Sequence, residues 1–335
     1  MTIQDKTDLP QVEYDENAQV DPAAGDRFSF VVGPDRAGER LDKVISDSIP
    51  GQSRSYIKKL IKDGYISLKD PLNKQKAVKP SLIVCGGETV SVFLPVQVLP
   101  DILPEDIPLD ILYEDNDVLV VNKPKDMVVH PAAGHYSGTL VNAVLFHCKG
   151  SLSGINGVLR PGIVHRIDKD TTGSIIVCKN DAAHRCIAEQ LKEHSITRRY
   201  RGIVIGNVPR DDGTIEGNIG RNPYDRKKMS IVREGGKPAV THYHVLKRYS
   251  GYTYCEFSLE TGRTHQIRVH MASIGHPLVG DSVYGPARSA FHIEGQALHA
   301  MVIGFVHPAT GEYLSFTAPL PEYFTELLQK LEHRQ

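Results

Sequence analysis

Residues 162–173 read G-I-V-H-R-I-D-K-D-T-T-G, and this stretch decides how the rest of the chain is interpreted. It places two carboxylates, a histidine, an arginine and a lysine directly before the apolar run Ile175–Val177, which predicts a buried strand. One interpretation is an ordinary loop in which Asp and Thr side chains cap a turn, and for an arbitrary loop it would be preferred. The other is a functional site whose chemistry depends on Asp168.

Further segments surround this stretch in a particular order. They are N-K-P (Asn122–Pro124), V-V-H-P (Val128–Pro131), T-R-R-Y-R-G-I-V-I-G (Thr197–Gly206), E-T-G-R-T-H-Q-I-R-V-H-M (Glu260–Met271), P-L-V-G-D-S-V-Y-G (Pro277–Gly285), Q-A-L-H-A (Gln296–Ala300) and H-P-x-T-G-E (His307–Glu312). Together with H-R-I-D-K-D-T-T-G at 165–173, they resemble the RluA-type RNA pseudouridine synthases. That family's motif H-R-L-D-x-x-T-S-G has leucine and serine where this chain has Ile167 and Thr172.

Within that family the chain is most similar to the RluD type, and G-K-P-A-V-T-H-Y at Gly236–Tyr243 supports this subtype. The RluC type shares the two-domain layout. The resemblance implies isomerisation of specific uridines to pseudouridine in RNA. It also implies large-subunit ribosomal RNA, free or within the pre-ribosomal large subunit, as the partner. No motif shows which uridines are modified.

The resemblance assigns roles to particular side chains. Asp168 would initiate the reaction, and as a carboxylate it could act either as a nucleophile or as the base that starts glycosidic elimination. Tyr200 would stack on the target base. Arg263 would pair with Asp168 and keep it ionised by lowering its pKa. A paired uridine must be flipped out, and Arg166 is the candidate that fills the gap it leaves.

The reaction involves no net oxidation or reduction, so we expect no cofactor. The chain contains neither a G-x-x-x-x-G-K-[ST] phosphate loop nor a G-x-G-x-x-G between strand and helix. His265 and His270 lack H-E-x-x-H spacing, and His242 and His244 have no matched third ligand nearby, so no metal site is expected. Five scattered cysteines without C-x-x-C spacing argue against disulfides and a zinc ribbon.

The N-terminal third separates its charges, although the formal net charge of the chain is −1. Residues 1–26 carry seven acids and one lysine and predict a disordered tail. Residues 36–79 carry eleven basic and five acidic residues. Apolar spacing predicts a helix over 41–49 and a second helix that begins at the N-cap Ser53 and ends at Gly64. Strands are expected at 28–32, 65–68, near 81–84 and at 89–93.

The segments R-L-D-K-V-I-S and S-R-S-Y-I-K-K-L-I-K-D-G-Y-I-S-L resemble an S4 domain, a small RNA-binding module. The residues expected to contact RNA phosphates are Arg54, Lys58, Lys59 and Lys62. A merely solvated helix face is the alternative. Three further arginines, Arg198, Arg199 and Arg201, could also neutralise the RNA backbone or lie on a solvated surface.

The remaining chain predicts a second domain. Expected strands are 118–122, 174–179, 200–205, 240–247, 253–259 and 301–305, and expected helices are 139–147, 182–194, 266–274 and 321–332. Few long crossovers favour an α+β fold with a largely antiparallel, mixed sheet. The predicted organisation is a tail (1–26), an S4-like domain (27–95), a proline-rich acidic linker (96–108) and a catalytic domain (109–335).

The chain has no apolar run of roughly twenty residues and no signal peptide at its N-terminus, so we expect a cytoplasmic monomer that does not enter membranes. Two other functions remain open. Asp168 and Asp170 could form the acid and base of a hydrolase, although two residues of separation leave little room for a substrate. A non-catalytic RNA-binding or ribosome-assembly protein is the second.

Overall fold

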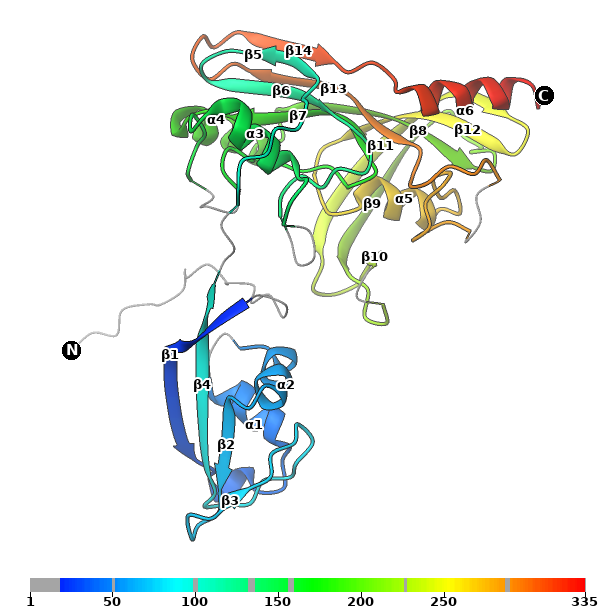
Figure 1. Cartoon of the computed structure of the whole chain (residues 1–335). Helices are drawn as coiled ribbons and strands as arrows, with labels where there is room; N and C mark the ends of the chain where they lie inside the picture. Colours follow the sequence, from blue (N-terminus) through cyan, green and yellow to red (C-terminus); the bar gives the residue numbers. More distant parts are fainter. Residues whose placement is uncertain are drawn as a thin grey trace. The chain divides into compact units, whose positions relative to one another are not determined.

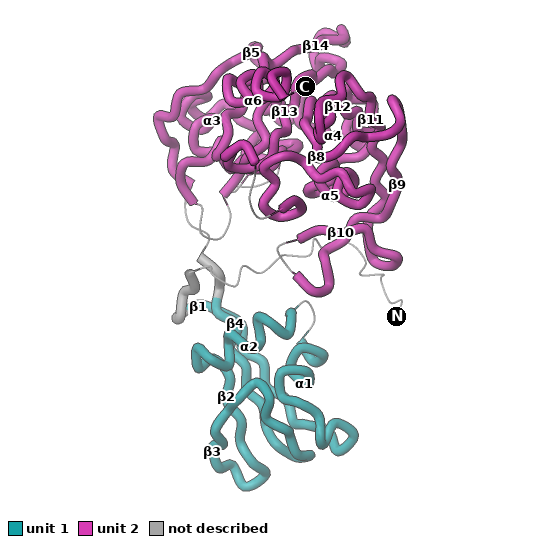
Figure 2. The backbone as a smooth tube through the Cα atoms, turned by 90° about the vertical axis from the view of Figure 1, so that its right-hand side faces the viewer, with its two compact units in different colours: residues 1–101 teal, residues 102–335 magenta. Residues whose placement is uncertain are grey.

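The computed structural model describes residues 19–49, 52–98, 102–131, 136–155, 160–225, 228–286 and 290–334. The chain divides into two compact units, residues 1–101 and 102–335 (Figures 1 and 2). Each unit has its own hydrophobic core, because the buried clusters do not mix residues from the two ranges. None of the helices in the described ranges is long and apolar enough to cross a membrane.

The first unit is a small sheet covered by two helices. The sheet has the order β1-β4-β2-β3, and its strands are β1 (Gln19–Val31), β2 (Ile66–Lys69), β3 (Gln75–Lys76) and β4 (Thr89–Val98). A short 3-10 helix, η1 (Pro34–Arg36), precedes α1 (Leu41–Ser48) and α2 (Arg54–Lys62). Ser53 caps α2, as predicted, because its side chain accepts a hydrogen bond from the backbone N–H of Tyr56 at 3.1 Å.

Three expectations for this region are corrected. Residues 19–26, expected in the disordered tail, belong to β1; 19–21 and 25–26 pair with β4 on either side of a register shift, and residues 1–18 lie outside the described range. Residues 81–84 form only an isolated bridge through Ile83 rather than a strand. The expected linker 96–108 is also too long, because β4 continues to Val98 and Ile102 is buried in the core of the second unit.

The second unit is built on one mixed sheet with the order β10-β9-β11-β12-β8-β13-β7-β6-β5, and β14 pairs with β13. The strands are β5 (Ile111–Glu114), β6 (Val118–Lys123), β7 (Thr172–Cys178), β8 (Thr197–Ile205), β9 (Asp212–Arg221), β10 (Met229–Ile231), β11 (Lys237–Tyr249), β12 (Tyr252–Leu259), β13 (Leu298–Val306) and β14 (Tyr313–Thr317). The helices are α3 (Leu140–Cys148), α4 (Asp181–Lys192), α5 (Gln266–Ser273) and α6 (Glu322–Glu332). All neighbouring strands run antiparallel except β13 and β7, which run parallel.

The expected mixed α+β architecture is therefore confirmed for this unit, and all six expected strands and four expected helices are present. The strands that were not predicted are β5, β9, β10 and β14. They are short or largely exposed, as in β14, where exposed and half-buried residues alternate. Short strands without a strong apolar pattern leave little signal in the sequence.

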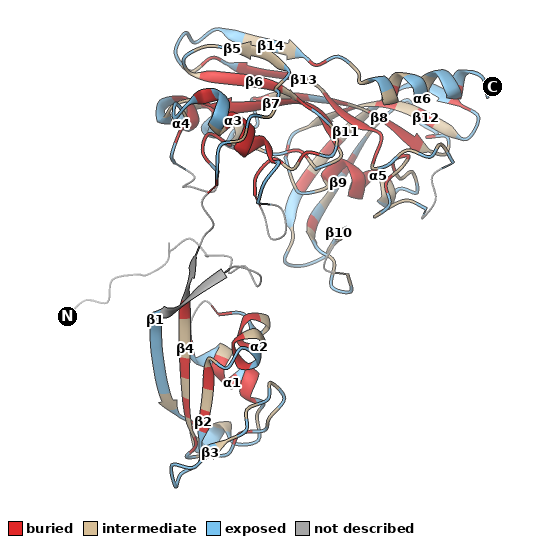
Figure 3. Cartoon of the chain, viewed as in Figure 1, coloured by how far each residue is buried: buried red, intermediate tan, exposed pale blue. Residues whose placement is uncertain are grey.

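β7 fixes the position of the stretch that precedes it. Every residue of β7 is buried, and Figure 3 shows the buried residues along the neighbouring strands of the sheet. Gly173 has φ +110° and lies opposite Ala300 of β13; a Cβ at Gly173 would come within 2.3 Å of the Ala300 carbonyl oxygen. Only glycine permits this close approach of β7 to β13. The stretch 162–171 is thereby held beside the start of β13.

Candidate active site

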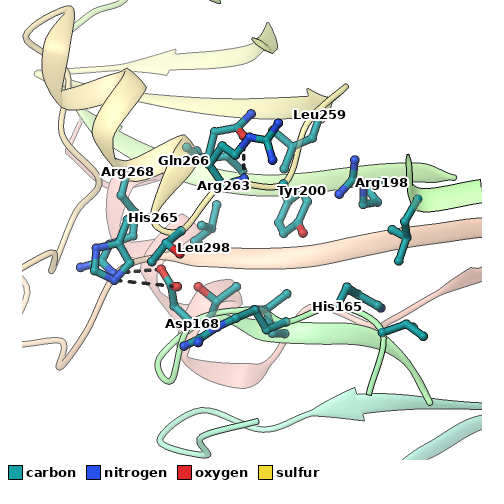
Figure 4. Close-up of a pocket in the computed structure, with 18 of the residues that line it drawn as sticks. His165, Asp168, Arg198, Tyr200, Leu259, Arg263, His265, Gln266, Arg268 and Leu298 are labelled. Carbon is teal, nitrogen blue, oxygen red and sulfur yellow. Dashed lines mark hydrogen bonds and ion pairs between the residues drawn. The ribbon is translucent and has the colours of Figure 1, made fainter. Parts of the chain in front are cut away.

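A cavity of about 490 Å³ lies next to this stretch, and its wall includes residues from the loop before β7, from β8, from the segment before α5 and from α5 (Figure 4). Asp168 is the only carboxylate among the described residues that line it. The other charged lining residues are cations: Arg166, Lys192, Arg198, Arg263 and Arg268. The cavity is therefore electropositive around a single acid.

A buried lysine holds the loop that carries Asp168. Lys123, at the end of β6, is 0% exposed, and its Nζ donates to the carbonyls of Pro124, Met127 and Lys169 at 2.7, 2.9 and 2.9 Å. Burial lowers the pKa of Lys123 to about 7. The hydroxyl of Thr171 accepts a further bond from Gln296 at 2.9 Å. These contacts fix the backbone on the C-terminal side of Asp168.

Asp168 itself is held by Arg268 of α5. Nη1 of Arg268 donates to Oδ2 of Asp168 at 2.9 Å, while Nε and Nη2 donate to the two carboxylate oxygens of Asp281 at 2.7 and 2.9 Å. The side chains of Arg268 and Asp281 are 6% and 0% exposed. Burial by itself lowers the pKa of Arg268, but Asp281 and Asp168 raise it above its ordinary value. Arg268 is thus a permanent charge that orients Asp168.

The expected pairing of Arg263 with Asp168 is wrong. Arg263 lines the cavity, but its Nε donates to the carbonyl of Pro238 at 2.9 Å. The reason is local geometry. The side chain of Gln266, at the start of α5, accepts a hydrogen bond from the Arg263 backbone N–H at 2.9 Å, which holds Arg263 in the loop before the helix. The side chain that reaches Asp168 comes from Arg268, farther along the helix.

Tyr200 occupies the wall formed by β8. Its side chain is 8% exposed and lines the cavity, and Figure 4 shows it between the Asp168–Arg268 pair and Arg198. Burial raises the pKa of the Tyr200 hydroxyl, and Arg198 opposes that shift. Tyr200 is therefore a neutral aromatic side chain at neutral pH, in the same cavity as Asp168.

The nearby histidines are neutral. The Nε2 of His165 accepts the backbone N–H of Ile176 at 2.9 Å, and burial lowers the pKa of His165 to about 3, so it packs as a structural acceptor. The Nε2 of His265 lies 3.9 Å from Oδ1 of Asp168, and burial lowers the pKa of His265 as well. Arg166 is exposed at the edge of the cavity, with its Nη1 3.5 Å from His130.

In the first unit, the expected RNA-contacting residues fall into two groups. Asp42 is fully buried and forms ion pairs with Arg54 at 3.0 Å and with Lys58 at 3.8 Å, so the charges of these two cations are partly neutralised within the unit. Lys59 is half-buried and Lys62 exposed, and within the described ranges neither makes an ion pair. Lys59 and Lys62 therefore keep more free charge than Arg54 and Lys58.

One group of side chains in the described ranges has the spacing of a metal site, namely Asp115, Asp117 and His307. Its ligand atoms are already engaged. Asp115 contacts Nε2 of His307 at 2.6 Å and accepts from the hydroxyl of Tyr113 at 2.9 Å and from two backbone N–H groups at 2.8 Å. None of the three lines the cavity, and the cluster is a hydrogen-bonded link between the β5–β6 turn and the end of β13.

The sequence interpretation missed three residues that build the site: Lys123, Arg268 and Asp281. A signal was present for two of them. Arg268 stands between Ile267 and Val269 in a helix whose first six residues are all buried, and a buried arginine requires a carboxylate partner. Its partner Asp281 lies within the quoted P-L-V-G-D-S-V-Y-G, but the pairing depends on the tertiary fold.

A single carboxylate locked by a buried guanidinium, facing a tyrosine in an electropositive cavity, defines an enzyme site suited to a polyanionic substrate. The sequence pattern of the RNA pseudouridylate synthase family matches residues 117–273, which include Asp168, Tyr200 and Arg268.

Relatives that match most of the chain belong to the same family. The chain is 50% identical over 305 residues to the RNA pseudouridine synthase YlyB of Bacillus subtilis, covering 91% of this chain and 98% of that protein. It is 47% identical over 304 residues to the ribosomal large subunit pseudouridine synthase D of Zymomonas mobilis, covering 88% and 94%. The solved human RNA pseudouridylate synthase domain containing 1 matches with a TM-score of 0.53 at 27% identity, covering 67% of this chain and 95% of that one.

The chain therefore belongs to the RNA pseudouridine synthase family. It is an isomerase that converts uridine to pseudouridine in RNA, which confirms the family expected from the motifs.

Proposed function

We propose that this enzyme forms pseudouridine in large-subunit ribosomal RNA, and that Asp168 initiates cleavage of the glycosidic bond. The substrate is supported by relatives named ribosomal large subunit pseudouridine synthase D, which cover most of the chain. The observation that carries the proposal is the ion pair of Asp168 with Arg268, because it fixes one carboxylate at the wall of a cavity that holds no other acid among its described residues.

In this proposal each residue of the site has a task. Arg268 occupies Oδ2 of Asp168, while Oδ1 accepts no hydrogen bond from the described residues and is free to meet the substrate. Asp168 then acts as nucleophile or as base on the flipped nucleotide. The bond between N1 of uracil and C1′ of ribose breaks, the base turns, and C5 bonds to C1′; C5 loses its proton and N1 takes one up, so the product is an isomer of the substrate. Tyr200 supplies an aromatic face against the base, and Arg263 binds the same nucleotide from the rim.

The first unit is proposed to be an S4-like RNA-binding domain whose exposed cations bind phosphates. Lys59 and Lys62 are the stronger candidates, because Arg54 and Lys58 share Asp42. Arg166, exposed beside the cavity, is proposed to fill the space that the flipped uridine leaves. We further propose that the enzyme acts as a monomer in the cytoplasm, where ribosomal RNA is the substrate.

The test is conversion of large-subunit ribosomal RNA by the purified protein and by Asp168→Asn. Wild-type protein should produce pseudouridine with no release of free uracil, and Asp168→Asn should produce none while still binding RNA. Release of free uracil would instead identify a hydrolase. Full activity of Asp168→Asn would disprove the role of Asp168.

A further inference from the structure

A second cationic group lies in the cavity, beyond Tyr200. Arg198 lines the cavity from β8 and is only 9% exposed (Figure 4). Its Nη2 donates to the carbonyl of Glu260 at 2.9 Å. Its Nε is buried without a hydrogen-bond partner, and the guanidinium forms no ion pair with any carboxylate in the described part of the chain. A buried charge without a counter-charge is unfavourable unless something else compensates it.

Arg263 adds to the same positive charge. Among the described residues its side chain also bonds only a backbone carbonyl, and it lines the same cavity. Burial lowers the pKa of Arg198, Tyr200 opposes that shift, and the charge of Arg263 adds to it. The acid of the cavity, Asp168, is already paired with Arg268. Arg198 and Arg263 therefore repel one another where no described acid neutralises them.

The chain also keeps space for this guanidinium. A Cβ on Gly262 would come within 2.6 Å of Nη1 of Arg198, so a glycine next to Arg263 leaves room for the group. Two other arginines of this unit are paired with carboxylates. Arg268 uses three nitrogens on two carboxylates, and Arg201, on the same strand as Arg198, pairs with Glu256 at 3.0 Å. Arg198 is buried on the same strand but has no described carboxylate partner, so its charge is available to a ligand.

We propose that Arg198 and Arg263 form an anion subsite that binds a phosphodiester group of the RNA strand carrying the target uridine. The inference rests on the proposed function only in taking RNA as the ligand. A guanidinium matches a phosphate through parallel N–H donors, and a full negative charge relieves the repulsion between the two arginines. A neutral uracil carbonyl would accept a hydrogen bond but would leave both charges uncompensated. The sequence alone does not distinguish Arg198 from Arg199 and Arg201. Of these three arginines, the proposed subsite includes only Arg198.

The experiment measures binding without turnover. Full-length protein with Asp168→Asn is titrated with a transcript of large-subunit ribosomal RNA over a series of KCl concentrations. Adding Arg198→Gln should weaken affinity on the order of tenfold, because a charge-assisted hydrogen bond is lost. It should also reduce the slope of log affinity against log salt by about 0.7, the value for one phosphate contact on a single strand. Arg198→Lys, which keeps the charge, should restore the slope.

The matched control is Arg201→Gln, since Arg201 lies on the same strand but pairs with Glu256 and does not line the cavity. Its salt slope should equal that of the parent. An unchanged salt slope in Arg198→Gln overturns the subsite, whether or not binding weakens. Weaker binding at an unchanged slope would indicate that Arg198 binds a neutral acceptor of the RNA instead of a phosphate. If Arg198→Gln does not fold, Arg263→Gln carries the same expectation, because that side chain is only half-buried. Absence of pseudouridine formation by the wild type would contradict the proposed function but leave this binding result standing.

Discussion

At the scale of single residues, Arg268 links Asp168, the carboxylate proposed to react, to the protein core. It bridges Asp168 and Asp281 with three nitrogens, and its guanidinium also lies over the Tyr284 ring at 5.1 Å from the centroid. A lysine in its place would keep the charge but would lack the planar fork that reaches two carboxylates at once. The position of Asp168 therefore depends on the shape of this side chain as much as on its charge.

Arg268→Lys should lower kcat by about a hundredfold, the scale of loss expected when a reacting group is misplaced by about an ångström, with a much smaller change in KM. Single-turnover rates of pseudouridine formation measure the effect. Arg201→Lys, which alters a pair outside the cavity, should leave kcat unchanged. Equal kcat for Arg268→Lys and wild type would show that Asp168 does not need this orientation.

Buried histidines predict how stability depends on pH. His270 is 0% exposed, and burial lowers its pKa to about 4, from an ordinary value of 6.5. The unfolded chain takes up a proton below pH 6.5 that the folded chain resists. The stability due to neutral His270 is therefore complete above pH 6.5 and is lost as the pH falls towards 4, at up to about 1.4 kcal/mol per pH unit.

Urea unfolding of wild type and His270→Gln at pH 7 and pH 5 tests this linkage. The wild type should lose more stability between the two values than the variant, which has one titrating group fewer. His130 and His165 have pKa values lowered by burial to about 4 and about 3, so both proteins should lose some stability. An equal loss in the two proteins would mean that His270 has the same pKa in the folded and the unfolded chain.

At the scale of elements, α1 and α2 are joined through Asp42. This carboxylate, near the start of α1, is fully buried and binds Arg40 at 3.1 Å and Arg54, the first residue of α2, at 3.0 Å. Burial raises the pKa of Asp42, but Arg40 and Arg54 outweigh it and lower the pKa below its ordinary value. The charge pattern that predicts RNA binding therefore also serves to pack the two helices.

Asp42→Asn should lower the free energy of unfolding of the first unit by about 2 kcal/mol, because the charge-assisted hydrogen bonds from Arg40 and Arg54 to the buried carboxylate are lost. Asp47→Asn is the matched control, since Asp47 also pairs with an arginine but is 47% exposed. It should change stability by less than about 1 kcal/mol. Urea unfolding of the full-length protein measures both. Equal losses in the two variants would argue against Asp42 as the link between the helices.

At the scale of the whole molecule, the chain consists of two compact units, residues 1–101 and 102–335. All the residues that hold Asp168 come from 102–335, and that unit has its own cores. The first unit contains Lys59 and Lys62, which are proposed to bind RNA phosphates. Each unit is thus expected to keep its fold without contributions from the core of the other.

Removing residues 1–101 should raise the KM for ribosomal RNA and weaken binding, with little change in kcat at saturating RNA. Initial rates of pseudouridine formation at physiological salt provide the measurement, and circular dichroism checks that the remaining unit is folded. Unchanged affinity would show that the first unit does not bind RNA. A loss of kcat in a folded protein would show that the first unit takes part in the active site.

The sequence by itself determined the family, the choice of Asp168 as the carboxylate of the site, and most of the helices and strands. These depend on local order, as in the residues around Asp168, and on apolar spacing, as in β7 and α5. Tyr200 was predicted for the site and does line the same cavity, because β13 pairs both with β7, which follows the loop, and with β8, which carries Tyr200.

Only the tertiary structure decided which arginine holds Asp168. Arg263 and Arg268 belong to one quoted motif, and their side chains differ in direction because the first precedes α5 and the second lies within it. Only the fold could show that Arg198 is buried without a counter-charge while Arg201 is paired. The physical reason is that an ion pair depends on distance and burial, which are set by strands and helices that lie far apart in the sequence.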